Sequence, residues 1–120
     1  MLKEAMLALR VTDMEYAPEI CRLLRAAEKD LRIAGVTIIG TCDFDIQIQT
    51  DQETEEETIT VTDDSAIEDE AITTAMITYA RMHFGSPPDF DRLAASYDLQ
   101  RRQLANATGY TNFMEEAGQG

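Results

Sequence analysis

Residues 75–110, AMITYARMHFGSPPDFDRLAASYDLQRRQLANATGY, predict two amphipathic helices joined by one short turn. Apolar residues recur at helical spacing before and after the turn, so each helix can face a core. Gly85 suits the left-handed position just past a helix end, and Pro87 and Pro88 cannot extend a helix because each lacks a backbone donor. We therefore expect the two helices to pack antiparallel.

Capping signals predict where these two helices begin. Asp64 or Ser65 can cap the first helix, and Ser65 with Glu68 three residues later has the form of a capping box. Asp89 or Asp91 can open the second helix. The expected inward residues are Ile67, Ala71, Ile72, Ala75, Met76, Tyr79 and Met82 in the first helix, and Leu93, Tyr97, Gln100, Leu104 and Ala107 in the second, which Gly109 ends.

The N-terminal part of the chain predicts two more helices. The first is short and is marked by its apolar residues, Leu2, Met6 and Leu9. The second is expected to begin near Pro18, which is tolerated in a first turn, and to run to Ala34, with Gly35 as its stop. Its expected inward residues are Ile20, Leu23, Leu24, Ala27, Leu31 and Ala34.

The middle of the chain changes to an alternating pattern. Apolar and polar residues alternate through residues 44–49 and again through residues 58–62, which is typical of two half-buried strands. The intervening residues 50–57 contain neither Gly nor Pro, so they predict a loop of several residues and not a two-residue turn. An isolated two-stranded hairpin is marginal in water, so its apolar face must rest on the helices or on another subunit.

Together these patterns predict a mainly α fold. It is a small bundle of about four helices, with an acidic β-hairpin or extended loop inserted at about residues 37–62, between the second and third long segments. A chain of this length makes one domain, which we place at residues 1–112, and residues 113–120 are expected to form a flexible tail.

Negative charge is concentrated in the middle of the chain, in the insertion and the residues that follow it. The chain has a formal net charge of -13, and residues 43–70 hold 12 of its 23 acids and no Lys or Arg. The rest of the chain contains 11 acids and 10 bases. The acidity is therefore a local feature that repels nucleic acid, not a bias spread over the surface.

Enzymatic and cofactor chemistry find little support in the sequence. Cys21, Cys42 and the single histidine, His83, lack metal-ligand spacing, so we expect no metal and no cofactor. Cys21 is expected to be a small buried hydrophobic residue, and Cys42 a free thiol. Asp43 and Asp45 can share one face of a strand, but no nucleophile, histidine or phosphate-binding loop accompanies them. The protein is therefore expected not to be an enzyme, and no catalytic residue is assigned.

A membrane or secreted protein is also not expected. Glu4 and Arg10 interrupt the apolar stretch at the N-terminus, and the longest aliphatic run, residues 36–39, is far shorter than the roughly 20 residues of a membrane helix. We expect a soluble, intracellular protein.

Three sets of residues are candidates for contacts with partners. The alternatives are a solvated face for the basic set and disorder for the tail set. The sets are the acidic loop Asp51, Glu53, Glu55, Glu56 and Glu57, the basic face Arg22, Arg25, Lys29 and Arg32, and the tail residues Tyr110, Phe113 and Met114.

A longer pattern of packing and turn residues runs through both ends of the chain. The C-terminal half contains, in order, Tyr79, His83-Phe84-Gly85, Pro88, Asp91-Arg92, Ser96-Tyr97-Asp98, Gln103-Leu104 and Ala107-Thr108-Gly109-Tyr110. The N-terminal part contains Leu9-Arg10-Val11, Glu19-Ile20, Leu23-Leu24, Ala26-Ala27, Asp30-Leu31 and Ala34-Gly35-Val36. Over residues 1–36 and 63–112 this pattern resembles the head-tail connector family of tailed bacteriophages, also called head-completion or DNA-packaging proteins.

The resemblance implies a virion structural protein at the head-tail interface, present in the host cytoplasm during assembly. Such a protein forms a ring, commonly a dodecamer, beneath the portal protein and above a stopper or tail-completion protein. DNA passes through the ring without sequence-specific binding. The alternative is an acidic DNA-mimic inhibitor of a DNA-binding enzyme, which would explain the charge but not the turn residues around Gly85 and Gly109.

Overall fold

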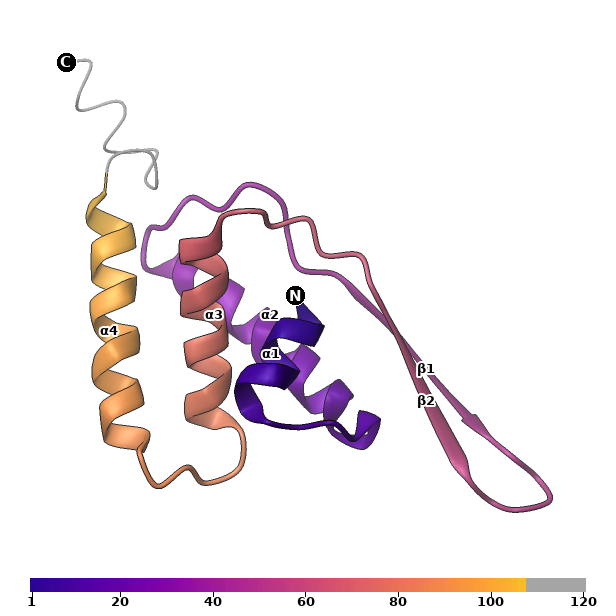
Figure 1. The fold of residues 1–120 in the computed structure, drawn as a ribbon. Helices are drawn as coiled ribbons and strands as arrows, with labels where there is room; N and C mark the ends of the chain where they lie inside the picture. The colour runs from indigo at the N-terminus through magenta and orange to yellow at the C-terminus, as the bar shows by residue number, and fades with distance from the viewer. Residues whose placement is uncertain (108–120) are drawn as a thin grey trace.

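The computed structural model describes residues 1–107 of the chain. Its elements are α1 (Leu2–Leu9), a 3-10 turn η1 (Met14–Tyr16), α2 (Ala17–Ile33), β1 (Phe44–Thr50), β2 (Glu57–Asp63), α3 (Glu70–His83) and α4 (Phe90–Asn106). Helices α3 and α4 lie side by side, α1 and α2 lie on the other side of α3, and β1 and β2 project away from the helices (Figure 1). The prediction of a mainly helical fold with a hairpin between the second and third long segments is confirmed.

Helix α2 supplies the centre of the core. Its side chains Ile20, Leu24 and Leu31 are fully buried, and Met76 of α3 packs into the same cluster. Burying side chains of this size stabilises a fold by about 1.5–3 kcal/mol each before the cost of ordering the chain is counted. The predicted stripe of α2 is buried at Ile20, Leu24, Ala27 and Leu31. That of α3 is buried at Ile72, Ala75 and Met76, but Ala71 is exposed and Ile67 lies before the helix, contrary to the prediction.

Local signals set the start of η1 and the two ends of α2. Asp13 accepts a hydrogen bond from the backbone N–H of Glu15 at 2.9 Å and so caps the 3-10 turn η1. Pro18 stands in the first turn of α2, and Gly35, with a φ of 99°, follows its end. The predicted start near Pro18 and stop at Gly35 are confirmed.

The predicted start of α3 is wrong. Helix α3 begins at Glu70, and Asp69 caps it by accepting hydrogen bonds from the backbone N–H groups of Ala71 and Ile72. Ser65 cannot serve as the cap because its Oγ accepts a hydrogen bond from the backbone N–H of Asp43 at 3.1 Å. Residues 64–66 instead run extended beside residues 41–43, to which they are bonded through two backbone N–H groups.

The turn between α3 and α4 follows the sequence more closely. Gly85 has a φ of 66°, the left-handed conformation that the sequence predicts. Asp89 occupies the N-cap position of α4 without a side-chain cap bond, and its carboxylate pairs with Arg92. Helix α4 ends at Asn106, whereas the predicted stop, Gly109, lies outside the described residues.

The hairpin is antiparallel, and its register places the predicted apolar residues opposite one another. Ile46 pairs with Val61, and Ile48 pairs with Ile59. Thr50 and Glu57 are the last pair, so the loop spans residues 51–56, slightly shorter than the sequence suggested. We refer to residues 44–63 as the arm.

A polar network fixes the connection from α2 to the arm. Glu28 accepts hydrogen bonds from the Thr41 hydroxyl at 2.8 Å and from the backbone N–H of Cys42 at 2.7 Å. These donors and Arg32 outweigh the effect of partial burial and hold the pKa of the Glu28 carboxyl below its ordinary value. Gly40 has a φ of 85° and lies so close to Ala66 that a Cβ added to Gly40 would stand 2.6 Å from the Ala66 carbonyl oxygen.

Candidate interaction surfaces

The apolar face of the arm is covered at its base and uncovered toward its tip. Phe44 is buried, and Ile46 and Val61 are half-buried against the helices. Ile48, farther out on the same face, is 57% exposed. The helices therefore cover only the base of the hairpin. The apolar face of its outer half does not rest on them, so the sequence prediction that the helices support the hairpin holds for the base alone.

The tip of the arm is held by its own backbone. Asp51 N–H donates to the Glu56 carbonyl at 2.8 Å, and Glu55 N–H donates to the Asp51 carbonyl at 2.7 Å. Glu55 adopts a φ of 60°, and Glu53 N–H donates to the Asp51 carboxylate at 2.9 Å. The carboxylates of this loop are exposed and have no ion pair with any residue between 1 and 107.

Glu57 stands apart from the other acids of the predicted loop. It is the first residue of β2, and with Ile59 it lines a hollow against η1. Successive residues of a strand alternate between faces, so Glu57, Ile59 and Val61 share the apolar face of the arm. The acidic loop therefore comprises Asp51, Glu53, Glu55 and Glu56, while Glu57 is a charged residue on an apolar strand face.

The basic face of α2 is partly used within the subunit. Arg25 donates to the Phe44 carbonyl at 2.7 Å and lies over the Phe44 ring, with 5.6 Å between guanidinium carbon and ring centroid. Arg32 donates to the Gly40 carbonyl at 2.8 Å. Arg22 and Lys29 are exposed and form no ion pair with residues 1–107. Two of the four predicted bases thus anchor the arm and its connection, and two are available to a partner.

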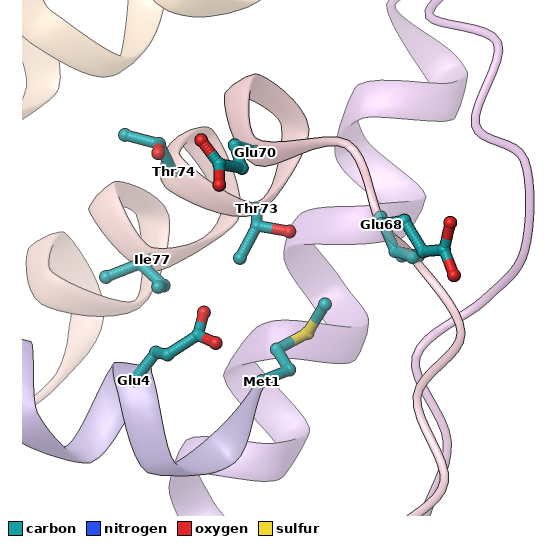
Figure 2. A pocket seen from close by; sticks show the side chains of 8 residues that line it. Met1, Glu4, Glu68, Glu70, Thr73, Thr74 and Ile77 are labelled. Atoms are coloured by element: carbon teal, nitrogen blue, oxygen red, sulfur yellow. The ribbon is translucent and has the colours of Figure 1, made fainter.

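A recess of about 500 Å³ that the sequence did not indicate lies between the start of α1, the segment before α3 and α3 itself. Its lining includes Glu4, Glu68, Glu70, Thr73 and Thr74, and Figure 2 shows that the Glu68 carboxylate points away from the other labelled side chains. Glu4 is far in the sequence from Glu68 and Glu70, so no local motif predicts that the three carboxylates lie around one recess. Among residues 1–107, neither a cysteine nor a histidine lines the recess.

An apolar groove of about 430 Å³ lies on the other side of α1, against β2. We call it the α1 groove. Its apolar lining comprises Leu2, Met6, Leu7, Val11, Met14 and Val61. Lys3 and Asp63 stand at its edge. Asp63 is already engaged, because its Oδ2 accepts hydrogen bonds from the Met1 ammonium at 2.9 Å and from Leu2 N–H at 2.8 Å.

The remaining candidates for chemistry do not form a reactive site. Cys21 and Cys42 are buried free thiols, and burial raises their pKa values to about 11 and about 12. His83 is exposed and packs beside Tyr79, with 4.4 Å between ring centroids. Between residues 1 and 107, no group of three or more His, Cys, Asp or Glu side chains is placed to hold a metal ion. The predicted tail residues Tyr110, Phe113 and Met114 lie outside the described residues.

Comparison with known proteins finds no relative of this chain. No family model, no curated protein and no solved structure matches the chain. Within residues 1–107, no helix is both long enough and apolar enough to cross a membrane. The fold and its surfaces define a mainly helical protein with a projecting acidic arm and an apolar groove at the base of that arm.

Proposed function

We propose that the protein is a virion structural subunit that assembles as a ring beneath the portal of a tailed bacteriophage, joins the head to the tail and extends the DNA channel. The observation that carries the proposal is the arm: a base-free hairpin with an exposed acidic loop, attached to helices whose charges are otherwise balanced. The resemblance in the packing and turn residues of the two ends of the chain supports the same function.

The mechanism is mechanical, and the protein is not an enzyme and needs no cofactor. Double-stranded DNA binds proteins largely through Lys and Arg contacts that release counterions, and carboxylates offer no such gain. An acidic loop that faces the channel would therefore keep passing DNA from adhering. The alternative is that the loop faces a neighbouring ring protein. The protein partners are other copies of the chain, the portal protein and a stopper or tail-completion protein. The protein would reside in the virion, after assembly in the host cytoplasm.

A closed ring needs head-to-tail contacts, in which one face of a subunit meets a different face of the next. The two unpaired bases of α2, Arg22 and Lys29, are candidates for one side of this contact, and the acidic segment of the neighbour is the candidate for the other. Opposite charges on the two faces would favour the correct order of subunits and reject like faces.

The test is light scattering of the purified chain, alone and mixed with a portal ring, across a range of protein concentrations. We expect a defined ring, formed by the chain alone or nucleated by the portal. A chain that ignores the portal at every concentration would overturn the proposal. A portal ring whose subunits come from an unrelated phage is the matched control for non-specific adhesion.

A second function, an acidic DNA-mimic inhibitor, is favoured by one observation. The loop carboxylates of Asp51, Glu53, Glu55 and Glu56 are exposed and form no ion pair with residues 1–107, so they are available to a basic, DNA-binding surface. Capture of a DNA-binding enzyme by the chain, in competition with DNA and without any portal binding, would support this function over the first.

A further inference from the structure

The outer half of the arm presents apolar side chains with carboxylates beside them. Ile48 is 57% exposed, and Ile59, directly opposite it on the hairpin, is half-buried. The hollow between η1 and β2 is lined by Asp13, Met14, Glu15, Glu57 and Ile59, so its lining has three acids and, among residues 1–107, no base. We call Ile48, Ile59 and Glu57 the outer arm face. A partner that covers this face must bring positive charge, because a second acidic surface would be repelled.

Helix α2 has a surface of the required kind on the side opposite its buried side chains. With 3.6 residues per turn, Arg22, Lys29 and Ile33 stand in one row along the helix. Ile33 is 76% exposed, and the two bases are exposed and form no ion pair with residues 1–107. Glu19 stands before Arg22, at the other end of the row from Ile33, and Asp30 is bonded to α4. We call Arg22, Lys29 and Ile33 the outer α2 face.

The two faces agree in spacing as well as in charge. Glu57 and Ile59 are two residues apart on one face of β2, which is about 7 Å along a strand. Lys29 and Ile33 are four residues apart on α2, which is about 6 Å along a helix. The distance from the apolar to the charged side chain is therefore similar on both faces, so the apolar and the ionic contact can form together.

We infer that the outer arm face of one subunit docks on the outer α2 face of the next subunit. Ile33 packs against Ile48 and Ile59, and the Lys29 ammonium meets the Glu57 carboxylate. Two different faces of the chain are used, so the contact is head-to-tail and continues from subunit to subunit. The contact also covers the outer half of a hairpin that is marginal in water by itself.

The inference deepens the proposed function and rests on it for the closure of these contacts into a ring. It assigns the strand face of the arm to the subunit contact, and thereby leaves the tip loop, residues 51–56, free to face the channel. The two proposals can fail separately. This contact in a chain that never binds a portal would refute the connector function alone, and portal binding without this contact would refute the inference alone.

The first experiment is disulfide trapping between Ile33→Cys and Ile48→Cys, in the free chain at high concentration and in the mixture with a portal ring. The two single variants together should give a mixed covalent dimer, and a chain that carries both changes should give a series of larger multimers. The control pairs Ile48→Cys with Leu99→Cys, because Leu99 is 49% exposed on α4. Cys21 and Cys42 are buried, so they do not compete as thiolates.

We expect several-fold more mixed dimer from the Ile33→Cys pair than from the control pair. Equal yields in both preparations would overturn the inference. A preference of Ile48→Cys for pairing with itself would overturn it as well, because two outer arm faces would then meet.

The second experiment reverses charges in the chain that carries both cysteines. Lys29→Glu and Glu57→Lys should each lower the yield of covalent multimers several-fold, because each places like charges together at every contact. The two changes combined in one chain should restore the yield, since every contact is again between opposite charges. Lys3→Glu and Glu68→Lys change the net charge equally at positions outside both faces and should leave the yield unchanged. A combined variant that does not recover, or controls that lower the yield equally, would contradict the assigned contact.

Discussion

The hydroxyl of Tyr97 donates a hydrogen bond of 2.5 Å to Oδ2 of Asp30, although the two residues are 67 positions apart in the sequence. Arg101, one turn after Tyr97, donates to the same oxygen at 3.3 Å. Burial and the bond to the Asp30 carboxylate both hold the pKa of the Tyr97 phenol well above its ordinary value. These hydrogen bonds link α2 directly to α4. The two helices are otherwise connected mainly through α3, which packs against both.

Replacing Tyr97 with Phe should destabilise the protein by about 1–2 kcal/mol, because hydrogen bonds to charged groups are worth somewhat more than neutral ones and the ring itself is retained. Urea denaturation followed by circular dichroism measures the loss. Tyr16→Phe is the matched control, because the Tyr16 ring is exposed and its edge contact with Phe84 does not involve the hydroxyl. Equal stabilities of the two variants would show that the Asp30 bond contributes little.

Asp63 should give the protein an acid-sensitive contact. Partial burial would raise the pKa of its carboxyl, but hydrogen bonds from Ser65, the Met1 ammonium and Leu2 N–H outweigh burial and lower the pKa to about 2. A carboxyl with a depressed pKa stabilises the fold at pH values above its unfolded pKa, and this contribution is lost as pH falls through the folded pKa. The window of loss therefore runs from about pH 4 down to about pH 2.

The measurement is the free energy of unfolding as a function of pH for wild type and Asp63→Asn. Above pH 4 the wild type should be more stable by roughly 2 kcal/mol, the linkage value for a shift of nearly two pKa units. The difference should shrink toward zero near pH 2. Asp64→Asn is the control, since the exposed Asp64 side chain has no hydrogen bond or ion pair with the rest of residues 1–107. A difference that stays constant with pH would refute the assignment.

Gly40 should be one of the least replaceable residues of the connection to the arm. Gly40→Ala combines a positive φ with a Cβ that would meet the Ala66 carbonyl oxygen at 2.6 Å, so a loss of about 2–3 kcal/mol is expected. Gly35→Ala isolates the two effects, because Gly35 has a φ of 99° but no atom within 4 Å of an added Cβ. Thermal unfolding should therefore rank Gly40→Ala below Gly35→Ala. Equal unfolding temperatures would show that Ala66 can move away from the Cβ added at position 40 without loss of stability.

Helix ends that depend on nearby residues could be predicted from the sequence. Pro18 and Gly35 bound α2, and Gly85 follows α3, because each acts through its own backbone conformation. The start of α3 could not be predicted in the same way. Ser65 has the chemistry of a cap, but Asp43, 22 positions earlier, occupies its hydroxyl.

The surfaces were predictable only where one segment makes them. The base-free loop at the arm tip is contiguous in sequence, so its charge is visible without a structure. The α1 groove joins Leu7 to Val61, and the recess joins Glu4 to Glu70. Neither pairing has a sequence signal, because each depends on how the arm and α3 pack against α1.

Reversing the charge of the arm tip should convert a surface that repels DNA into one that binds it. The variant carries Lys at Glu53, Glu55 and Glu56, whose side chains are exposed and form no ion pair with residues 1–107, so the fold should be unaffected. Each added phosphate contact steepens the salt dependence of binding, so affinity for duplex DNA should rise at low salt and fall again as salt is added.

The matched control places the same three substitutions around the recess, at Glu4, Glu68 and Glu70, which changes the net charge equally. Fluorescence anisotropy with labelled duplex DNA compares the two variants across salt concentrations. If DNA responds to the projecting loop in particular, the tip variant should bind more tightly and with a steeper salt slope than the recess variant. Equal binding would mean that net charge alone governs the contact, and the arm would then have no special role toward DNA.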